Sequence, residues 1–413
     1  MVLAACATIG HAGETYDLGG LYTYHYRDGR YADWGDYERH GAQIAIQELN
    51  ASGILGDDRL RMTDENIIDY HCWPENAALM AETLMKKDIL VLTGADCSGP
   101  AVAIAKVGEK YRIPVISNGA NASMLSSPEA FPYFVRVVTP SEQYDGYLMD
   151  VAAHFGVKEI ALFHTTDAWG LGAKNVVHEF ARARDIRIAK EYGYPRDTPY
   201  EDVRAHLKEV KQAGIRHIVN TSPTPDTVTM FRALHELGMN VPGYSFYAAE
   251  MISADEAPEA VRGSLGYFAP MSELVPSPKL TEFSRALETR LGKAVEPTSK
   301  AFFYGALSYD HMLAVGYALR DLKNAGLDVT GPNMMTFLRK MDFDGATGRV
   351  SLVPGTNDRA NMPVQIFNSH GYEADGKTVD FVSVGRVDPA TGRLTMNEDA
   401  IVWPGNVTTP PEH

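Results

Sequence analysis

The stretch that decides the fold is residues 89–123, which read ILVLTGADCSGPAVAIAKVGEKYRIPVISNGANAS. The apolar run Ile89–Leu92 predicts a buried strand. Pro100 stands just inside the start of a helix that Ala101–Tyr111 continues. Ile113–Ile116 predicts the next strand. A strand, a helix and a second strand in succession indicate a parallel sheet that helices cover on both faces.

The same alternation of helices and strands continues on both sides of this stretch. Upstream, helices are predicted over Tyr37–Leu49, with Gly53 as a stop signal, and over Pro74–Lys87. Downstream, a second series of strands and helices begins at Glu159 and is predicted over residues 160–163, 173–183, 203–210, 215–219, 226–237 and 244–247. We therefore predict two similar α/β halves, with the changeover near residues 138–141.

After Pro270 the pattern becomes mostly helical, over Lys279–Leu291, Ser299–Leu322 and Pro332–Met341, and from Arg349 it turns to strands. A helical block that follows two α/β halves packs most simply on one of them. The sequence therefore predicts a bilobed protein in which several segments cross between the lobes.

Composition excludes several classes of protein. Apolar residues make up 45% and charged residues 22% of the 413, as in ordinary globular proteins. The net charge of −15 argues against a nucleic-acid partner, because phosphate binding needs a basic surface. No stretch approaches the roughly 18 apolar residues that a membrane helix needs.

Enzymatic signatures are missing from the sequence. It has no Gly-x-Ser-x-Gly elbow, no phosphate-binding Gly-x4-Gly-Lys-Ser/Thr and no His-Glu-x-x-His, and its 13 histidines do not cluster at metal spacing. Gly170-Leu-Gly172 is too short for a dinucleotide fingerprint. We expect no enzyme, no catalytic residue, no metal and no cofactor.

Four polar turns follow predicted strands, at Asp96–Gly99, Ser117–Ser123, Thr165–Gly170 and Ala248–Glu250. In open parallel sheets, ligands bind outside the carboxyl ends of the strands. These turns are therefore the candidate ligand contacts.

The chemistry of the turns fits a zwitterion. Ser98, with backbone N–H groups near Gly119 and Asn121, suits an anion, because N–H groups at a helix start favour negative charge. Glu250 and Trp169 suit an ammonium group by ion pairing and cation–π attraction. Each residue also has a purely structural interpretation, as a helix cap, a turn residue, a solvated acid or a packing aromatic. The same alternatives hold for Trp34 and Asp96.

The three cysteines bear on the compartment. A disulfide between Cys72 and Cys97 would close a loop of about 25 residues, worth roughly 3.5 kcal/mol in the chain-entropy model, and would place the protein outside the cytosol. The alternative is two unrelated buried thiols. Leu3-Ala-Ala-Cys6 is typical of the end of a lipoprotein signal, or is the remnant of a leader cut short.

Several motifs in order resemble those of a known family. They are Trp34-Gly-Asp36 with Gly41–Asn50, Ile113–Ser117 with Asn118–Ser123, Asp167-Ala-Trp-Gly-Leu-Gly172, and Phe343-Asp-Gly-Ala-Thr-Gly-Arg-Val350. Over roughly residues 15–370 the chain resembles the type I periplasmic solute-binding proteins, in particular the leucine/isoleucine/valine-binding protein of ABC importers.

The resemblance implies roles for individual residues. Cys72 and Cys97 fall where the leucine-binding type has a disulfide. Ser98 matches the serine that holds the ligand carboxylate, Gly119 a residue whose backbone assists it, and Glu250 the acid that binds the α-ammonium.

The chain also departs from the family pattern. Asn121 replaces a threonine, Trp34 and Trp169 replace tyrosines, and Ser222 stands in a loop where another tyrosine is missing. Asp96 replaces an apolar neighbour. These departures suit a larger, cationic or aromatic ligand.

The implied organisation is a first lobe of residues 14–139 and 270–347 and a second lobe of residues 140–269 and 348–385. Hinges are expected near residues 139–140, 268–270 and 347–350. Residues 386–413 form an extension that resembles the tail of sensor-type members, and residues 1–13 are a leader remnant or a lipoprotein start.

The implied function is that of a periplasmic or otherwise extracytoplasmic monomer, anchored through Cys6 if that residue carries a lipid. It would capture a small-molecule ligand, an amino acid first of all, and dock on the membrane permease of an ABC importer. The alternative is a ligand sensor of the same fold for amides or amino acids, which feeds a regulatory partner.

Overall fold

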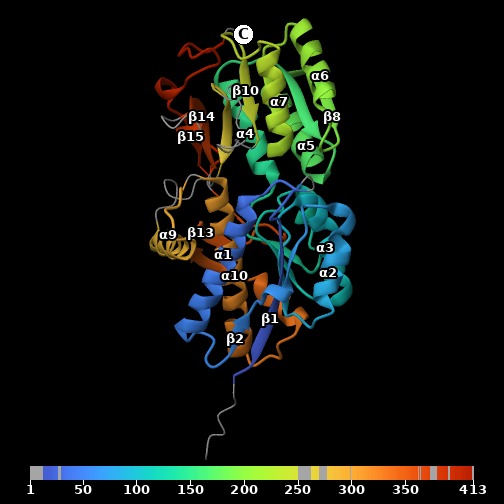
Figure 1. Ribbon diagram of the computed structural model, residues 1–413, viewed down its shortest axis with the longest axis vertical. Coiled ribbons are helices and arrows are strands. Elements are labelled where there is room, and N and C mark those ends of the chain that lie inside the picture. The colour runs from blue at the N-terminus through green and yellow to red at the C-terminus, as the bar shows by residue number, and fades with distance from the viewer. Residues whose placement is uncertain are drawn as a thin grey trace, which may run out of the picture.

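The computed structural model describes residues 13–26, 29–249, 262–268, 277–297, 299–360, 362, 364–372, 379–388 and 391–411 of the chain. These residues form two lobes that lie end to end along the longest axis of the molecule (Figure 1), and each lobe is built on its own sheet. The structure therefore confirms the predicted bilobed α/β fold. Cys6 and Glu250 lie outside the described residues.

The described strands of the first lobe form a parallel sheet in the order β2-β1-β4-β5-β6, with β3 paired to the later half of β1. The strands are β1 (Thr15–Tyr22), β2 (Arg59–Arg61), β3 (Ile67–Asp69), β4 (Val91–Gly94), β5 (Val115–Ser117) and β6 (Phe134–Arg136). The helices around them are α1 (Asp33–Ser52), α2 (Pro74–Met85), α3 (Ser98–Tyr111), α9 (Pro278–Leu291), α10 (Lys300–Asn324) and α11 (Gly331–Leu338).

The described strands of the second lobe form an eight-stranded sheet in the order β16-β15-β14-β11-β10-β9-β7-β8. Its members are β7 (Glu159–Thr165), β8 (Arg187–Tyr194), β9 (His217–Thr221), β10 (Ser245–Ala248), β11 (Leu265–Phe268), β14 (Val364–Tyr372), β15 (Val379–Val387) and β16 (Leu394–Met396). The strands from β8 to β11 run parallel, whereas β14, β15 and β16 are antiparallel to their neighbours. The helices are α4 (Ser141–His154), α5 (Ala168–Ala183), α6 (Tyr200–Gln212) and α7 (Thr224–Glu236).

Both faces of each sheet are buried, which explains the apolar runs in the sequence. In β4, Val91 packs in the cluster that contains α1 and α10, and Leu92 packs in the cluster that contains α2 and α3. In β7, Leu162 packs in the cluster that contains α4 and α5, and Phe163 packs in the cluster that contains α6 and α7. Since successive side chains of a strand point to opposite faces, each of these positions must be apolar.

The sequence patterns did not predict β8. This strand lies at the edge of its sheet and is only partly buried over most of its length, with residues such as Lys190 and Glu191 among its members. An edge strand of this kind lacks the apolar run that identifies a central strand.

The C-terminal extension belongs to the second lobe. β16 pairs with β15, and the side chain of Asn368 on β14 exchanges hydrogen bonds with the backbone of Val402 at 2.8 and 3.0 Å. The ring of Trp403 is buried edge-on against Phe155 of the segment after α4, with 4.9 Å between the ring centroids. None of the helices in the described parts of the chain is both long and apolar enough to span a membrane.

The chain crosses between the lobes three times. The first crossing runs through Thr139 and Pro140, between β6 and α4. The second, between β11 and α9, falls in residues 269–276, outside the described residues. The third follows Ala360, whereas the sequence placed it near residues 347–350. The hairpin of β12 (Asp342–Gly345) and β13 (Gly348–Ser351) and the loop after it stay with the first lobe.

A buried polar network holds this loop on the first lobe. The carboxylate of Asp358 pairs with Arg136 of β6 at 2.7 Å, and both side chains are almost fully buried. Arg359, also buried, donates to the carbonyl oxygen of Val137 at 3.0 Å. These contacts place the third crossing after the loop and not before it.

Breaking the buried Arg136–Asp358 pair should destabilise the protein strongly. Asp358→Asn leaves a buried guanidinium without its counter-charge, and we expect the free energy of unfolding to fall by about 3 kcal/mol. The control is Arg349→Met, because Arg349 pairs with Asp342 at 2.7 Å but its side chain is 55% exposed. That change should cost less than about 1 kcal/mol. If urea unfolding shows that both variants lose the same free energy of unfolding, the Arg136–Asp358 pair does not have the stabilising role that we assign to it.

Candidate ligand-binding site

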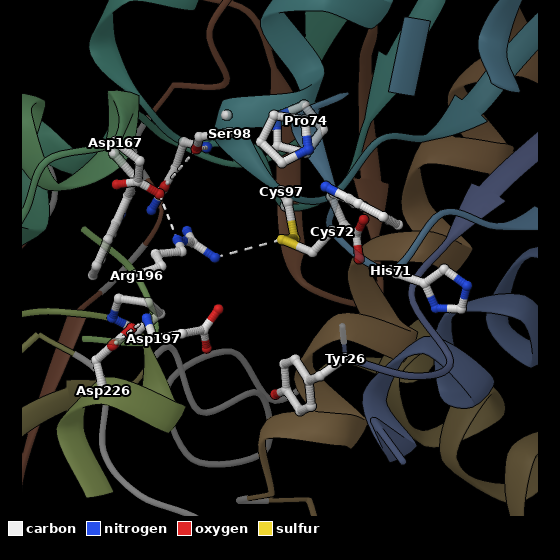
Figure 2. Close-up of a pocket in the computed structure, with 18 of the residues that line it drawn as sticks. Tyr26, His71, Cys72, Pro74, Cys97, Ser98, Asp167, Arg196, Asp197 and Asp226 are labelled. Atoms are coloured by element: carbon white, nitrogen blue, oxygen red, sulfur yellow. Dashed lines mark hydrogen bonds and ion pairs between the residues drawn. A yellow bond between two sulfur atoms is a disulfide. The ribbon is translucent and has the colours of Figure 1, made fainter. Parts of the chain in front are cut away.

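A cavity of about 430 Å³ lies between the two lobes, and residues of both line it (Figure 2). The turns after β4 and β5 form its wall in the first lobe, and the turns after β7, β8 and β9 form its wall in the second. Parallel strands of a sheet end along one edge, so turns far apart in the sequence meet here. The volume lies within the range of small-molecule sites.

The structure brings together most of the residues that the sequence predicted as ligand contacts. Six of the eight line the cavity: Trp34, Asp96, Ser98, Gly119, Asn121 and Trp169. Ser222 does not, because its buried Oγ lies 2.7 Å from the hydroxyl of Tyr194, and its neighbour Pro223 faces the cavity instead. Glu250 lies outside the described residues.

Ser98 joins the turn after β4 to the turn after β5. Its Oγ accepts hydrogen bonds from the backbone N–H groups of Asn121 and Ala122, both at 3.1 Å. The N–H of Gly119 donates to the hydroxyl of Ser117 at 3.3 Å. The N–H groups predicted as anion donors therefore already have acceptors within the protein. Among the described residues, the acceptor for the hydroxyl hydrogen of Ser98 is Oδ1 of Asn121, at the long distance of 3.5 Å.

One wall of the first lobe combines aromatic rings with a cation. The side chain of Ser299 caps α10, so that Lys300 is the first residue of this helix and lies at the cavity. Its Nζ is 5.7 Å from the ring centroid of Trp34 and 5.9 Å from that of Tyr304. The two rings are 5.2 Å apart, and the indole N–H of Trp34 donates to the hydroxyl of Tyr26 at 3.2 Å. This wall offers flat apolar surface next to positive charge.

The opposite wall contains an ion pair between Asp167 and Arg196. Oδ1 of Asp167 caps α5 by accepting the N–H of Gly170 at 3.0 Å, and the first turn of the helix places Trp169 in the wall. Oδ2 of Asp167 pairs with Arg196 at 2.6 Å. Arg196 in turn donates to Sγ of Cys72 in the first lobe at 3.6 Å (Figure 2). Arg196 therefore connects the two lobes at the edge of the cavity.

Asp226, near the start of α7, is a buried acid of this wall. Its Oδ1 accepts the backbone N–H of Asp197 at 3.0 Å. Burial raises the pKa of Asp226 to about 6, although the nearby charge of Arg196 opposes the shift. This carboxyl group therefore changes charge close to neutral pH.

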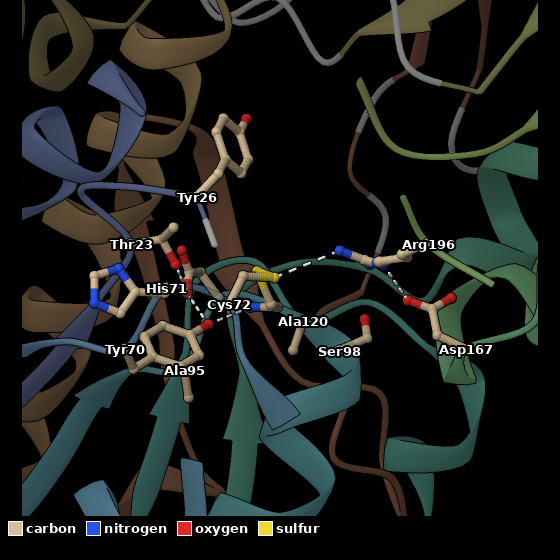
Figure 3. The surroundings of a disulfide bond; sticks show 12 residues. Thr23, Tyr26, Tyr70, His71, Cys72, Ala95, Ser98, Ala120, Asp167 and Arg196 are labelled. Carbon is tan, nitrogen blue, oxygen red and sulfur yellow. Dashed lines mark hydrogen bonds and ion pairs between the residues drawn. A yellow bond between two sulfur atoms is a disulfide. The ribbon is translucent and has the colours of Figure 1, made fainter. Parts of the chain in front are cut away.

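The structure confirms the predicted disulfide between Cys72 and Cys97, whose Cα atoms are 5.6 Å apart (Figure 3). The bond ties the loop before α2 to the turn after β4, and both cysteines line the cavity. The hydroxyl of Tyr70 accepts the backbone N–H of Cys97 at 2.8 Å and donates to Asp96. The disulfide thus fixes the turn that carries Asp96 and Ser98.

Two buried carboxyl groups meet behind this turn. Glu38 of α1 is fully buried and accepts a hydrogen bond from the side-chain amide of Asn118, and Asp96 accepts from Tyr70 and Thr23. No amide, hydroxyl or cation among the described residues reaches Oε2 of Glu38 or Oδ2 of Asp96. The two groups share a side-chain hydrogen bond. A bond between two carboxyl groups requires a proton on one of them, because two ionised carboxylates repel each other.

Burial raises the pKa of both carboxyl groups. Desolvation, followed by the charge of Asp96, raises the pKa of Glu38 well above its usual range. Desolvation raises the pKa of Asp96 to about 7, although the hydrogen bond from Tyr70 opposes the shift.

Sequence reasoning missed several residues of the site. Glu38 carried a usable signal, because it falls on the buried face of α1 with Gly41 and Ala45, where a charged residue is unusual. Lys300 and Arg196 carried none, since each reaches the cavity from a segment far away in the sequence from the polar turns.

Removing the disulfide should lower stability without abolishing the fold. For Cys72→Ser/Cys97→Ser we expect the free energy of unfolding to fall by about 3.5 kcal/mol, from the greater freedom of the unfolded chain. Chemical denaturation with and without reductant checks this. Cys6→Ser is the control and should not change stability. A double variant as stable as the wild type would contradict the expectation.

Comparison with known proteins identifies the family of this architecture. Residues 38–371 match the family model described as the receptor family ligand binding region. Glutamate receptor 2.2 of Arabidopsis thaliana is 23% identical over 373 residues, which are 81% of this chain and 39% of that receptor. The leucine-, isoleucine-, valine-, threonine-, and alanine-binding protein of Pseudomonas aeruginosa is 23% identical over 242 residues, 58% of this chain and 62% of that protein. The chain thus spans less than half of the plant receptor.

Two solved structures share the fold. The solute-binding protein of an ABC transporter from Rhodopseudomonas palustris BisB5, in complex with 3,4-dihydroxybenzoic acid, has a TM-score of 0.74 at 20% identity and covers 91% of this chain and 98% of its own. The ABC transporter substrate-binding protein from Desulfitobacterium hafniense, in complex with Leu, has a TM-score of 0.67 at 17% identity and covers 89% of this chain and 100% of its own. With the family model matched over most of its length, the chain belongs to the receptor family ligand binding region and has the type I periplasmic binding fold.

Proposed function

We propose that the chain is the extracytoplasmic substrate-binding protein of an ABC transporter, and that it captures a small amino acid or a related zwitterion by closure of its lobes. The observation that carries this proposal is the cavity of about 430 Å³ lined by residues of both lobes. A ligand shifts the balance between open and closed forms only as far as it binds the closed form better, and contacts to both lobes supply that difference. The two solved relatives are ABC transporter proteins with a small ligand bound.

The ends of three helices support a ligand with a negative group. α3, α5 and α7 all begin at the cavity, at Ser98, Ala168 and Thr224. The N-terminus of a helix carries partial positive charge and favours an anion. The hydroxyl hydrogen of Ser98 and the ammonium group of Lys300 are donors on the first-lobe wall. A ligand carboxylate held at Ser98 satisfies both the dipole of α3 and this hydroxyl.

The other end of the ligand would meet the second lobe. Glu250 remains our predicted partner for the α-ammonium group, and Trp169 lines the cavity on the same lobe. The rings of Trp34 and Tyr304 add flat apolar surface, which supports a ligand with a bulky or aromatic side chain over a small aliphatic one.

A ligand-sensing receptor is the second candidate. The observation that favours it is the match to glutamate receptors over about four fifths of this chain. In that role, a regulatory partner instead of a permease would recognise the closed form of the two lobes. Deleting the gene while the permease is intact distinguishes the two, because loss of ligand uptake supports transport and unchanged uptake supports sensing.

A thermal-shift screen over amino acids, amides and aromatic carboxylic acids tests the proposal. A ligand at 100 times its dissociation constant stabilises the folded protein by about 2.7 kcal/mol, which raises the melting temperature measurably. We expect the largest shifts for α-amino acids, and we expect Glu250→Gln to abolish them. Glu179→Gln is the matched control, because Glu179 lies exposed on α5 and away from the cavity.

Two results would contradict parts of this proposal. Shifts for carboxylates or amides that survive Glu250→Gln would remove Glu250 from the site and the zwitterion from the proposal. A protein that responds to none of the compounds, while its fold is intact by circular dichroism, would contradict small-ligand binding of these classes.

A further inference from the structure

The Glu38–Asp96 pair lies directly behind the proposed carboxylate position. Asp96 lines the cavity and is two residues from Ser98 at the start of α3, and Glu38 reaches it from α1 on the far side. Both side chains are buried, at 0% and 5% exposure. Any charge on this pair therefore acts on a ligand at Ser98 through a poorly solvated interior, where electrostatic interactions are stronger than in water.

The other titratable groups around the pair do not neutralise it by direct contact. Tyr22 of β1 and Tyr70 of the loop after β3 are buried phenols whose pKa values are raised, so both are neutral at physiological pH. The charge of Lys300 of α10 acts on Glu38 and favours its ionised form, and the ammonium group of Lys300 lies over the rings of Trp34 and Tyr304. The state of the pair is therefore set chiefly by how many protons it holds.

We propose that the Glu38–Asp96 pair determines which ligands the cavity accepts, by holding a proton between the two carboxyl groups and taking up a second when a ligand carboxylate binds at Ser98. This inference rests on the proposed function and adds a positioning residue, Glu38, that does not itself touch the ligand. The proton comes from solvent and adds to Oδ2 of Asp96, and no bond to the ligand forms or breaks.

The direction of the pH dependence follows from the charge of the pair. Desolvation raises the pKa of Asp96 to about 7 and that of Glu38 well above its usual range, so the pair takes up protons and loses negative charge as the pH falls through this region. At higher pH the negative charge of the pair repels the ligand carboxylate. Carboxylate ligands should therefore bind more tightly below pH 7 than above it, and their binding near pH 7 should consume protons.

Isothermal titration calorimetry between pH 6 and pH 8, in buffers of different ionisation enthalpy, tests this with L-leucine and 3,4-dihydroxybenzoate as probes. For the wild type, we expect the dissociation constant to rise about fivefold or more over this range, with net proton uptake on binding. Asp96→Asn should bind with little pH dependence and no uptake, because an amide stays neutral. Glu179→Gln, which alters an exposed acid on α5 away from the cavity, should keep the wild-type slope.

A comparison of Glu38→Leu with Glu38→Gln separates the positioning role from a merely structural one. Leucine removes the hydrogen bond that lowers the pKa of Asp96, so the pH dependence of binding should move to higher pH, whereas the glutamine amide still donates to Asp96 and should keep the wild-type pH dependence. A variant that only loosens the fold would instead weaken binding equally at every pH.

A measurement without ligand keeps the inference falsifiable. The infrared difference spectrum between wild type and Glu38→Gln at pH 7.5 should contain the C=O band of a protonated carboxyl group. Absence of this band, or wild-type affinity that is constant from pH 6 to pH 8 without proton uptake, overturns the inference while leaving the proposed function intact. If the band is present and neither probe binds at any pH, while the wider ligand screen is also negative, the proposed function and the coupling fail together.

Discussion

The common edge at which parallel strands end is the constraint on which the rest of this structure depends. In each lobe, the turns after the central strands have to lie side by side along that edge, whatever their distance in the sequence. The turn of Asp96 and Ser98 and the turn of Asn121 therefore meet in the first lobe, and Trp169 and Asp226 meet in the second. Because the two edges face each other across the cavity, four separate parts of the chain contribute to its walls.

The lobes can serve as the two halves of such a site only if each keeps its shape. In the first lobe, the disulfide fixes the turn that carries Asp96, and the hydroxyl of Ser98 bonds this turn to the next one. The buried pair of Arg136 and Asp358 anchors the last segment before the third crossing. With the first lobe fixed in this way, we propose that movement between the lobes concentrates where the chain passes from one lobe to the other, as in hinged binding proteins.

Much of this arrangement could be predicted from the sequence because the signals are local. Apolar runs gave the central strands, and polar residues that follow such runs indicated Ser98, Asn121 and Trp169 as cavity residues. The pairing of the cysteines was open on spacing alone, and the resemblance to the leucine-binding type favoured the bond that the structure contains. The third crossing was misplaced because the network around Asp358 depends on contacts more than 200 residues apart in the sequence.

Other features could not be predicted from the sequence because they depend on how distant segments pack. Whether Ser222 or Pro223 faces the cavity depends on the hydroxyl of Tyr194, which comes from a strand that shows no apolar run. Lys300 and Arg196 reach the cavity only once the helical block and the edge strand have packed. Charge balance in the site was therefore less predictable than its position.

The positions of the tryptophans make the intrinsic fluorescence of the protein sensitive to its cavity. Of the four in the sequence, Trp34, Trp73 and Trp169 line the cavity, with the first two in one lobe and the third in the other, while Trp403 is buried against Phe155 far from it. Indole emission depends on the polarity and mobility of its surroundings. Three of the four indole rings thus lie in the walls of the cavity, where a bound ligand changes their surroundings, so that occupancy can be followed by intrinsic fluorescence without a dye.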